Sequence, residues 1–283
     1  KIALGRQSKL DRYLAGTNKK AFEAIEKFEQ NNNVKLTPQQ KKLADEYAVE
    51  IFNDSQYAPL LYLYTIISGG FKEGWIPDNY FGIYVAPQKG LPLVSVYKSL
   101  SNVIFKTDLF PDIAYYINGM FYNQDFSPIN IADLQAIIGN NYPSVIVKGD
   151  DSNQAKDIYK IRTESLNEDT FKRVGNCVIQ SPINQHRFFE NVISGPVANI
   201  RISTVRNPDG RIEYRAAHVI FGRKDDVIVN IRKAYAVVPI RNIDGDLDPY
   251  CYTEKWERTL SHPDTGFVFS NKQIPNFNDA VDA

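Results

Sequence analysis

The chain has 283 residues, of which 43% are hydrophobic and 23% are charged, a composition typical of a folded globular protein. Lysine plus arginine and aspartate plus glutamate both total 33, and this zero net charge disfavours a nucleic-acid binder that relies on bulk positive charge. The longest nearly unbroken apolar run, residues 57–67, is too short to cross a bilayer. Two cysteines, Cys177 and Cys251, cannot build a disulfide framework. We therefore expect a soluble, cytoplasmic protein of one or two domains whose natural start has been trimmed or left out, since residue 1 is lysine.

Residues 1–70 are predicted to be helical. Within residues 19–30, Phe22, Ile25 and Phe28 recur about one turn apart, and three asparagines then break the pattern. Thr37 begins a second helix, because Pro38 suits the first helical position and Gln40 completes a capping box. The apolar stripe of this second helix comprises Leu43, Ala44, Tyr47, Ala48, Ile51 and Phe52.

A third helix is predicted over residues 57–67, ending at a pair of glycines. Residues 70–90 are rich in glycine, proline and aromatic residues, which indicates irregular structure tied down by its aromatic side chains. We interpret residues 1–90 as a helical region that serves the rest of the chain, with an interaction surface, for instance for a homo-oligomer, as the alternative. The aromatic residues concerned are Trp75, Tyr80, Phe81 and Tyr84.

After a short helix predicted over residues 99–105, turn signals occur at residues 110–112 and 117–119, and the second half of the chain is typical of strands. The turn Asn207-Pro208-Asp209-Gly210 separates two of these strands and predicts a hairpin. The order of elements predicts an α+β fold with antiparallel sheets after an N-terminal helical region. The predicted strands lie within residues 143–150, 176–182, 197–206, 211–221, 226–232 and 234–240, and a further turn is predicted at residues 243–246.

Residues 201–241 contain nine basic residues against four acids. Strand periodicity divides them between two faces, so they form either a solvated sheet surface or, through the inward-facing subset, a site for an anion such as phosphate. The nine are Arg201, Arg206, Arg211, Arg215, Arg223, Lys224, Arg232, Lys233 and Arg241.

Lys148 ends the apolar run of residues 143–150, so its ammonium group would emerge from a buried strand. A lysine in that position either faces a cleft or an anion, or extends to solvent from the strand end. Lys98 follows a similar apolar run. His186 and His262 are candidates for acid–base or ligand roles, whereas His218 lies within a strand and is expected to be packed.

Several familiar site motifs are absent from the sequence. There is no histidine pair at metal-ligand spacing and no Cys-x-x-Cys, so a zinc site has no support. The Walker and dinucleotide glycine motifs and the Gly-x-Ser-x-Gly elbow are also missing. These absences disfavour P-loop, Rossmann-type and serine-hydrolase chemistry.

Taken in order, the segments PSVIVKGD, CVIQSPINQH, ANIRISTVRNPDG and HPDTGFVFSNKQIP resemble the ATP-grasp superfamily, and within it the sugar-transfer-associated ATP-grasp proteins of bacterial surface-polysaccharide clusters. IPDNYF, Lys98 and INGMFY fit the same order, and the resemblance covers residues 70–283. It implies two α+β lobes, residues 91–180 and 181–283, after a helical region of residues 1–90, with ATP bound between the lobes.

The resemblance also implies roles for individual residues. Lys98 and Lys148 would contact the phosphates of ATP, and Ile179 and Gln180 would lie on the strand whose backbone groups read adenine. Arg201 would stabilise the phosphoryl group in transfer, with Asn199 positioning its surroundings. Loose phosphoryl-transfer states need fixed positive charge and Mg²⁺ more than a covalent nucleophile. The remaining implied site residues are Asn230 for the metal, Gln185 and His186 for the nucleotide, and His186 and His262 toward the acceptor substrate.

The sequence departs from the family pattern at three places. Residues 149–154 replace a glycine-rich phosphate loop and include Asp150 and Asp151, whose charges would repel phosphate. Val229-Asn230 stands where the family has an Asp-Asn pair, and Arg232-Lys233-Ala234 where glycines are expected. The sequence also stops before the family's strand that carries Mg²⁺ ligands, so either that end was not included or the metal site is incomplete.

These observations leave three hypotheses. The first is an ATP- and Mg²⁺-dependent carboxylate–amine ligase that forms an acyl phosphate and amidates a uronic-acid sugar with an amino acid during surface-polysaccharide synthesis. The second is a degenerate ATP-grasp protein that serves as a scaffold or nucleotide-binding subunit, which the altered loop favours. The third is an ATP-grasp phosphotransferase acting on a hydroxyl group.

Overall fold

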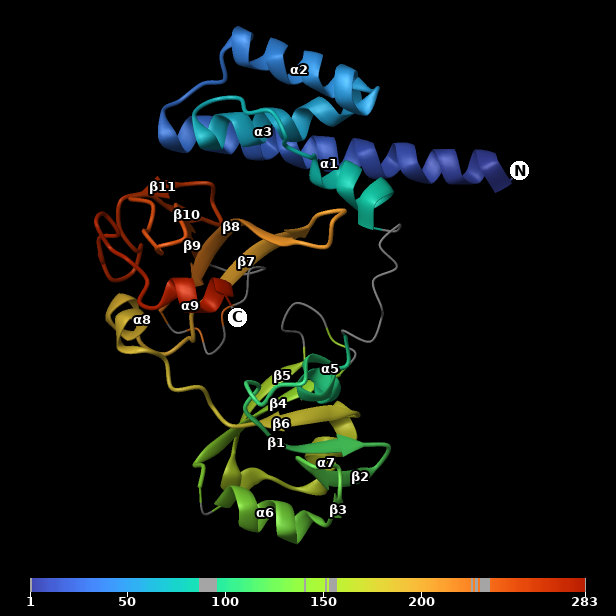
Figure 1. Ribbon diagram of the computed structural model, residues 1–283, viewed down its shortest axis with the longest axis vertical. Helices are drawn as coiled ribbons and strands as arrows, with labels where there is room; N and C mark the ends of the chain where they lie inside the picture. The colour runs from blue at the N-terminus through green and yellow to red at the C-terminus, as the bar shows by residue number, and fades with distance from the viewer. Residues whose placement is uncertain are drawn as a thin grey trace. The chain divides into compact units, whose positions relative to one another are not determined.

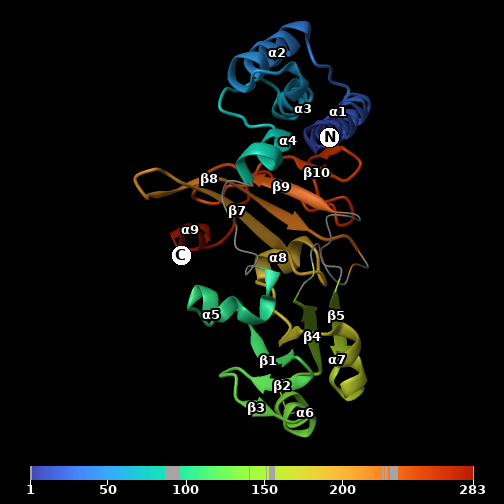
Figure 2. The same cartoon turned by 90° about the vertical axis from the view of Figure 1, so that its right-hand side faces the viewer.

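The computed structural model describes residues 2–86, 96–139, 141–150, 152, 157–224, 226, 229 and 235–282. The chain forms two compact units (Figures 1 and 2): Lys1–Leu91 with Tyr252–Thr259, and Pro92–Cys251 with Leu260–Ala283. The first unit is mainly helical and the second contains two antiparallel sheets, so the predicted α+β class with an N-terminal helical region is confirmed. Within the described ranges, every helix is too short or too polar to cross a membrane.

Three main helices form the helical unit, and each coincides with a predicted one. The capping box is confirmed, because Gln40 N donates to Thr37 Oγ1 across 3.2 Å and Thr37 N donates to Gln40 Oε1 across 2.9 Å. Phe28 is fully buried whereas Phe22 is 52% exposed, because a three-residue spacing drifts around a 3.6-residue helix. The helices are α1 (Ile2–Asn32), α2 (Pro38–Phe52), α3 (Ala58–Ser68) and α4 (Asp78–Tyr80), with helical turns at Ser55–Tyr57 and Phe81–Val85.

Aromatic side chains fill the contact between these helices and the segment after α3. Trp75 packs edge-on against Tyr64 and Phe71, and Tyr80 lies 4.6 Å from Phe52 between ring centroids. The predicted role of Trp75 and Tyr80 in tying down this segment is therefore confirmed. Tyr84 also packs on Tyr80, with ring centroids 4.9 Å apart, whereas Phe81 has no ring contact among the described aromatic pairs and is 44% exposed. Residues 87–90 lie outside the described part of the chain.

The turn at residues 252–259 belongs to the helical unit, which the sequence did not predict. Asn32 Nδ2 donates to Trp256 O across 2.8 Å, and Arg258 N donates to Asn32 Oδ1 across 2.7 Å. Asn31 Nδ2 binds Lys255 O in the same way. The asparagines predicted to break the helix thus end α1 and also hold a turn more than 200 residues later in the chain. Strands β10 (Cys251–Thr253) and β11 (Arg258–Thr259) flank this turn.

The first sheet of the second unit has six strands in the order β3-β2-β1-β6-β4-β5. Helices α6 and α7 supply Leu134, Ile138 and Phe171 to one face of it, where they pack with Val145 and Val147 of β4. This face is the buried face of the sheet. The strands are β1 (Asp112–Ile117), β2 (Met120–Asn123), β3 (Pro128–Ile129), β4 (Ser144–Gly149), β5 (Ile158–Arg162) and β6 (Cys177–Gln180), with α6 at Ile131–Gly139 and α7 at Glu168–Val174.

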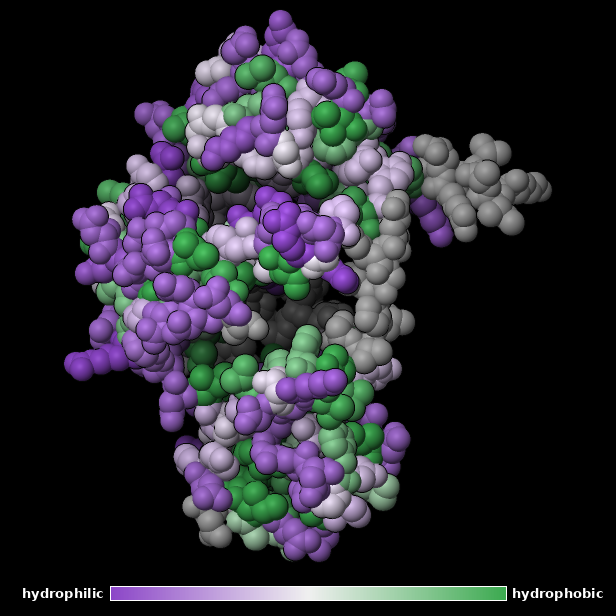
Figure 3. Space-filling model, in the orientation of Figure 1, coloured by the Kyte–Doolittle hydropathy of each residue, from purple (hydrophilic) through white to green (hydrophobic). Residues whose placement is uncertain are grey.

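The turn predicted at residues 117–119 is the turn of the β1–β2 hairpin. Asn118 and Gly119 have φ angles of 51° and 84°, the left-handed pair that a tight two-residue hairpin turn requires. The short helix before the sheet, α5 (Ser101–Phe105), follows the 3₁₀ turn η5 (Lys98–Leu100) and confirms the helix predicted there. Its apolar side chains, Val103, Ile104 and Phe105, are largely exposed, and hydrophobic residues gather over α5 in Figure 3.

The second sheet contains, within this unit, β7 (Asn199–Arg206), β8 (Ile212–Phe221) and β9 (Ala236–Ile240), joined in that order. The predicted hairpin is confirmed: Asn207 N donates to Arg211 O across 2.8 Å, and Figure 2 shows β7 and β8 as a long ribbon. Its core face carries Ala217, Val219 and Phe221, which pack against Val238. The short helices are α8 (Arg187–Val192) and α9 (Phe277–Asp282), and the strand predicted at residues 226–232 lies mostly outside the described residues.

The turn predicted at residues 243–246 is formed around Gly245. Its φ of 90° is left-handed, and a Cβ there would lie 2.7 Å from Phe277 Cβ. Only glycine fits this position without displacing α9. The turn at residues 243–246 is thus both formed and fixed by packing.

Candidate functional site

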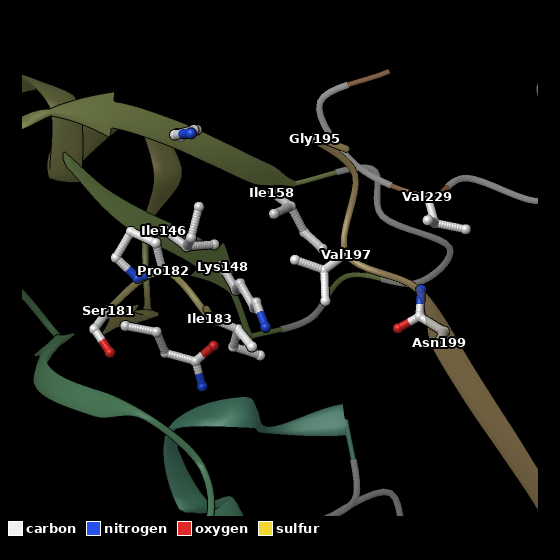
Figure 4. A pocket seen from close by; sticks show the side chains of 12 residues that line it. Ile146, Lys148, Ile158, Ser181, Pro182, Ile183, Gly195, Val197, Asn199 and Val229 are labelled. Carbon is white, nitrogen blue, oxygen red and sulfur yellow. The ribbon is translucent and has the colours of Figure 1, made fainter. Parts of the chain in front are cut away.

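A pocket of about 330 Å³ lies where residues of the first sheet and of β7 meet. Its described walls combine aliphatic side chains with five polar residues, Lys148, Lys160, Gln180, Ser181 and Asn199, a mixture found in many small-molecule sites. Figure 4 shows Lys148 extending into it from β4, with Asn199 facing it from the start of β7. The described lining residues are Ile146, Lys148, Ile158, Lys160, Gln180, Ser181, Pro182, Ile183, Gly195, Val197, Asn199 and Val229.

The pleat of β4 places Lys148 in the pocket. Val145 and Val147 are fully buried against the helices, so the alternate residues Ile146 and Lys148 point to the opposite face. Antiparallel pairing sets Lys148 beside Ile158 and Ile146 beside Lys160 of β5. Two lysines therefore alternate with two isoleucines on the pocket face.

Lys148 is a half-buried cation whose charge no neighbour compensates directly. Among the described residues, none forms a hydrogen bond or an ion pair with its Nζ atom. Burial lowers the pKa of Lys148 and the positive charge of Lys98 lowers it further, while the Asp112 carboxylate acts in the opposite direction. A bound anion would relieve this cost, because a nearby negative charge favours the protonated amine.

Asp112 is the polar residue that sequence reasoning missed. It is 3% exposed, and its Oδ1 accepts a 2.7 Å hydrogen bond from Gln180 Nε2. Tyr115 Oη and Asn102 Nδ2 both donate to its Oδ2 across 3.0 Å. Burial raises the pKa of Asp112, and these three donors oppose that rise. The sequence signal available was an aspartate directly before the apolar run of β1.

Gln180 reaches the pocket but Ile179 does not. Ile179 pairs with Ala114 of β1 and with Val147 of β4, so its backbone lies inside the sheet and its side chain is in the core. The Ile179 backbone is thus engaged within the sheet, while the residues after the strand end, Ser181–Ile183, line the pocket. Directly after the strand, Ser181 N donates a hydrogen bond to Pro111 O across 2.9 Å, and the chain then leaves the sheet.

Gln185 and His186 lie in the segment that leads to α8 and are not among the described lining residues. Gln185 Oε1 accepts from Ala198 N, and its Nε2 binds Ile193 O across 3.4 Å, which closes the loop around α8. His186 caps α8, since its Nδ1 accepts a 3.1 Å hydrogen bond from Phe188 N. The structure thus gives both residues local structural partners.

Lys98 holds the loop after β4 instead of lining the pocket. Its Nζ donates to the carbonyl oxygens of Gly149, Asp150 and Ser152 across 2.7, 2.9 and 2.8 Å. The Asp150 carboxylate is in turn bound by Ser99 N at 2.8 Å and Ser99 Oγ at 2.7 Å. The charge of Asp150, expected to repel phosphate, is therefore buried against η5. Asp151 lies outside the described residues.

Asn199 and Arg201 share one face of β7, because they are two residues apart on the strand. Arg201 pairs with His218 on β8 and is exposed, just beyond the described lining of the pocket. Burial lowers the pKa of His218, and the Arg201 charge adds to that effect. The structure brings Asn199 and Lys148 together and leaves Arg201 next along the strand.

His262 is fully buried in the core of the second sheet, away from the pocket lining. Its Nε2 lies 3.1 Å from Gly222 O, and its Nδ1 accepts a 3.3 Å hydrogen bond from Asp264 N. Burial lowers its pKa. With both ring nitrogens engaged inside the protein, His262 has the environment of a structural histidine.

Three of the seven basic residues of the 201–241 stretch that the structure describes form ion pairs with acidic residues. Arg211 pairs with Asp209 at 2.7 Å and Arg215 with Glu213 at 2.8 Å, both at the surface. Arg223 binds Asp264 through two nitrogens, and this pairing lowers the pKa of Asp264 to about 2. For Arg211 and Arg215 the solvated-surface interpretation is the better one, whereas the Arg223–Asp264 pair is mostly buried. Arg232 and Lys233 lie outside the described residues.

The described lining does not fit a magnesium ion, because it contains lysines and amides but no carboxylate. The described part of the chain also contains no group of three or more His, Cys, Asp or Glu residues placed to hold a metal. Asn230, the residue expected to bind the metal, lies outside the described residues.

The chain matches no protein-family model, and comparisons with characterised proteins and with solved structures give no match.

Proposed function

We propose that this chain is an ATP-grasp-type protein that binds ATP in the Lys148 pocket and acts as a carboxylate–amine ligase. The observation that carries the proposal is Lys148, a half-buried ammonium group without a hydrogen-bond or ion-pair partner among the described residues, in a pocket with aliphatic walls. Such a pocket suits a ligand with one flat apolar part and one anionic part, as a nucleotide has. Its volume of about 330 Å³ is in the range of known ligand sites.

Ile146, Ile158 and Val197 would enclose the base, Lys148 would contact a phosphate, and Asn199 would lie near the triphosphate. Arg201, further along the same face of β7, would stabilise the phosphoryl group in transfer. In the proposed reaction a carboxylate oxygen attacks the terminal phosphorus of ATP, and ADP leaves. An amine then attacks the acyl carbon, which releases phosphate and a proton and leaves an amide. A sugar acid and an amino acid are the substrates that the resemblance suggests.

A non-catalytic nucleotide-binding subunit is the second candidate. Two observations favour it: the described lining lacks a carboxylate for Mg²⁺, and the loop after β4 is fastened to Lys98 through its carbonyl oxygens. Such a protein would bind ATP with little dependence on Mg²⁺ and would produce no ADP when a carboxylate and an amine are supplied.

Calorimetric titration of ATP, with and without Mg²⁺, tests the proposal on the wild type, Lys148→Ala and Lys172→Ala. Loss of one charge-assisted phosphate contact should weaken binding by about 1.5–3 kcal/mol in Lys148→Ala. Lys172, an exposed lysine on α7, is the matched control and should bind like the wild type. If the wild type binds no ATP, or if Lys148→Ala binds as well as the wild type, the nucleotide site is elsewhere or absent.

Turnover separates the two candidate functions. Release of ADP that requires both a carboxylate and an amine supports the ligase. Lys148-dependent ATP binding without ADP release under any such pair supports the binding subunit.

A further inference from the structure

The orientation of the Gln180 side-chain amide, at the end of β6, is set by a hydrogen bond to Asp112. A side-chain amide has a donor end and an acceptor end, and a carboxylate accepts but does not donate when ionised. Because Asp112 Oδ1 lies 2.7 Å from Gln180 Nε2, the donor end of Gln180 is committed to Asp112. The acceptor end, Oε1, is left for another partner.

The acceptor end is available from the pocket. Gln180 lines the pocket, and no hydrogen bond to its Oε1 occurs among the described residues. In that part of the chain no buried side-chain nitrogen or oxygen lacks a hydrogen-bond partner, so an unpartnered Oε1 must be in contact with accessible space. Its neighbours on the same face of the sheet are Ile146, paired with it on β4, and Asp112, paired with it on β1.

Asp112 is itself held in place. Asn102 from α5 and Tyr115 from β1 bind its other carboxylate oxygen, so Oδ1 cannot rotate away from Gln180 without breaking two further hydrogen bonds. The carboxylate is almost completely buried, which makes an unpaired polar atom beside it costly. The row of hydrogen bonds from Asn102 and Tyr115 through Asp112 thus fixes which end of Gln180 faces a ligand.

We propose that Asp112 is a positioning residue that turns the Gln180 carbonyl oxygen toward the pocket, and that this acceptor selects a purine with an exocyclic amino group at position 6 over one with a carbonyl group there. The inference depends on the proposed nucleotide site and adds to it a determinant of base specificity. Adenine donates a hydrogen bond from its 6-amino group to Oε1. A 6-oxo purine would place two acceptor oxygens against each other.

The experiment compares binding of ATP with binding of ITP, which has a carbonyl group in place of the 6-amino group. Asp112→Asn keeps the shape of the side chain but supplies an amide donor, so Gln180 can reverse and present Nε2 to the pocket. We expect the ATP/ITP affinity ratio to fall about tenfold in this variant. Gln180→Leu, which removes both ends of the amide at the pocket edge, should lose the preference as well and serves if Asp112→Asn does not fold.

Tyr115→Phe is the matched control. It removes one hydrogen bond to Asp112 but leaves the Oδ1–Gln180 contact, so the ATP/ITP ratio should stay at the wild-type value even if stability falls. If the wild type binds ATP through Lys148 and the ratio is unchanged in both Asp112→Asn and Gln180→Leu, the positioning role is wrong while the nucleotide site stands. If the wild type binds neither nucleotide, the proposed function fails and this inference fails with it.

Discussion

Lys98 and Lys148 flank the same loop, yet their ammonium groups have opposite environments. Lys98 Nζ donates to three carbonyl oxygens of residues 149–152, while Lys148 Nζ has no hydrogen bond or ion pair with any described residue. The sequence resemblance implies that both lysines contact the phosphates of ATP. The structure instead separates them into a lysine that organises the loop and a lysine that faces the pocket.

Lys98→Met should destabilise the protein by about 2 kcal/mol, because it removes charge-assisted hydrogen bonds and leaves partly buried carbonyl oxygens without a donor. Denaturant unfolding measures the loss, and amide hydrogen exchange of residues 149–152 should accelerate. Lys172→Met, on exposed α7, should change stability by less than about 0.5 kcal/mol. Equal effects of the two substitutions would show that Lys98 does not hold the loop.

Ile179→Ala and Ile146→Ala test the two faces of the first sheet. Ile179 is fully buried in the core, so its truncation should cost about 2–5 kcal/mol of unfolding free energy. Ile146 is half-buried at the pocket, so Ile146→Ala should cost less stability and weaken ATP binding more. Thermal unfolding and nucleotide titration of both variants check this, and the reverse order of effects would contradict the assigned faces.

The free energy of unfolding should fall as the pH drops below about 6.5. Burial lowers the pKa of His262 from 6.5, so on acidification the unfolded chain takes up a proton before the folded chain does. The stabilisation is therefore complete above pH 6.5 and is lost as the pH falls toward the lower folded-state pKa; His218 acts in the same sense. His262→Gln, which keeps a donor for Gly222 O, should reduce the pH slope between pH 5 and 7.

The control for this titration is Asp264→Asn. The pKa of Asp264 is about 2, so its contribution is present above its unfolded value and is lost only near the acid end of the scale. Asp264→Asn should therefore lower stability at neutral pH. Because the Asp264 charge raises the pKa of His262, its removal lowers that pKa further and should not reduce the slope between pH 5 and 7. A slope that does not respond to His262→Gln would assign the acid sensitivity to other groups.

Asn32→Ala should loosen the turn at residues 252–259 within the helical unit. The substitution removes the donor to Trp256 O and the acceptor for Arg258 N, at a cost of about 1–3 kcal/mol. Faster hydrogen exchange at Arg258 is the direct measurement. Gln30→Ala removes only an exposed bond to Glu26 and serves as the control. Unchanged exchange in Asn32→Ala would mean that the asparagine does not hold the turn.

Local sequence patterns predicted the elements whose caps, turns or alternation are plain in the sequence. The capping box at Thr37, the Asn207–Gly210 turn and the alternation of β4 all depend on neighbours within a few residues, which the sequence displays directly. Strands β1, β2 and β5 and helices α6 and α7 were not predicted. Their patterns are short, and their type is decided by packing against β4 and β6 rather than by periodicity alone.

The sequence by itself determined that Lys148 emerges from a buried strand, because the strand is apolar up to that residue and successive side chains of a strand point to opposite faces. Only the tertiary structure decided which groups surround each candidate site residue. Strand pairing sets Asp112 beside Gln180 across 68 positions of sequence, and core packing encloses His262. Long-range contacts of this kind leave no periodic trace, because the partners are chosen by the folded sheet and not by neighbouring residues.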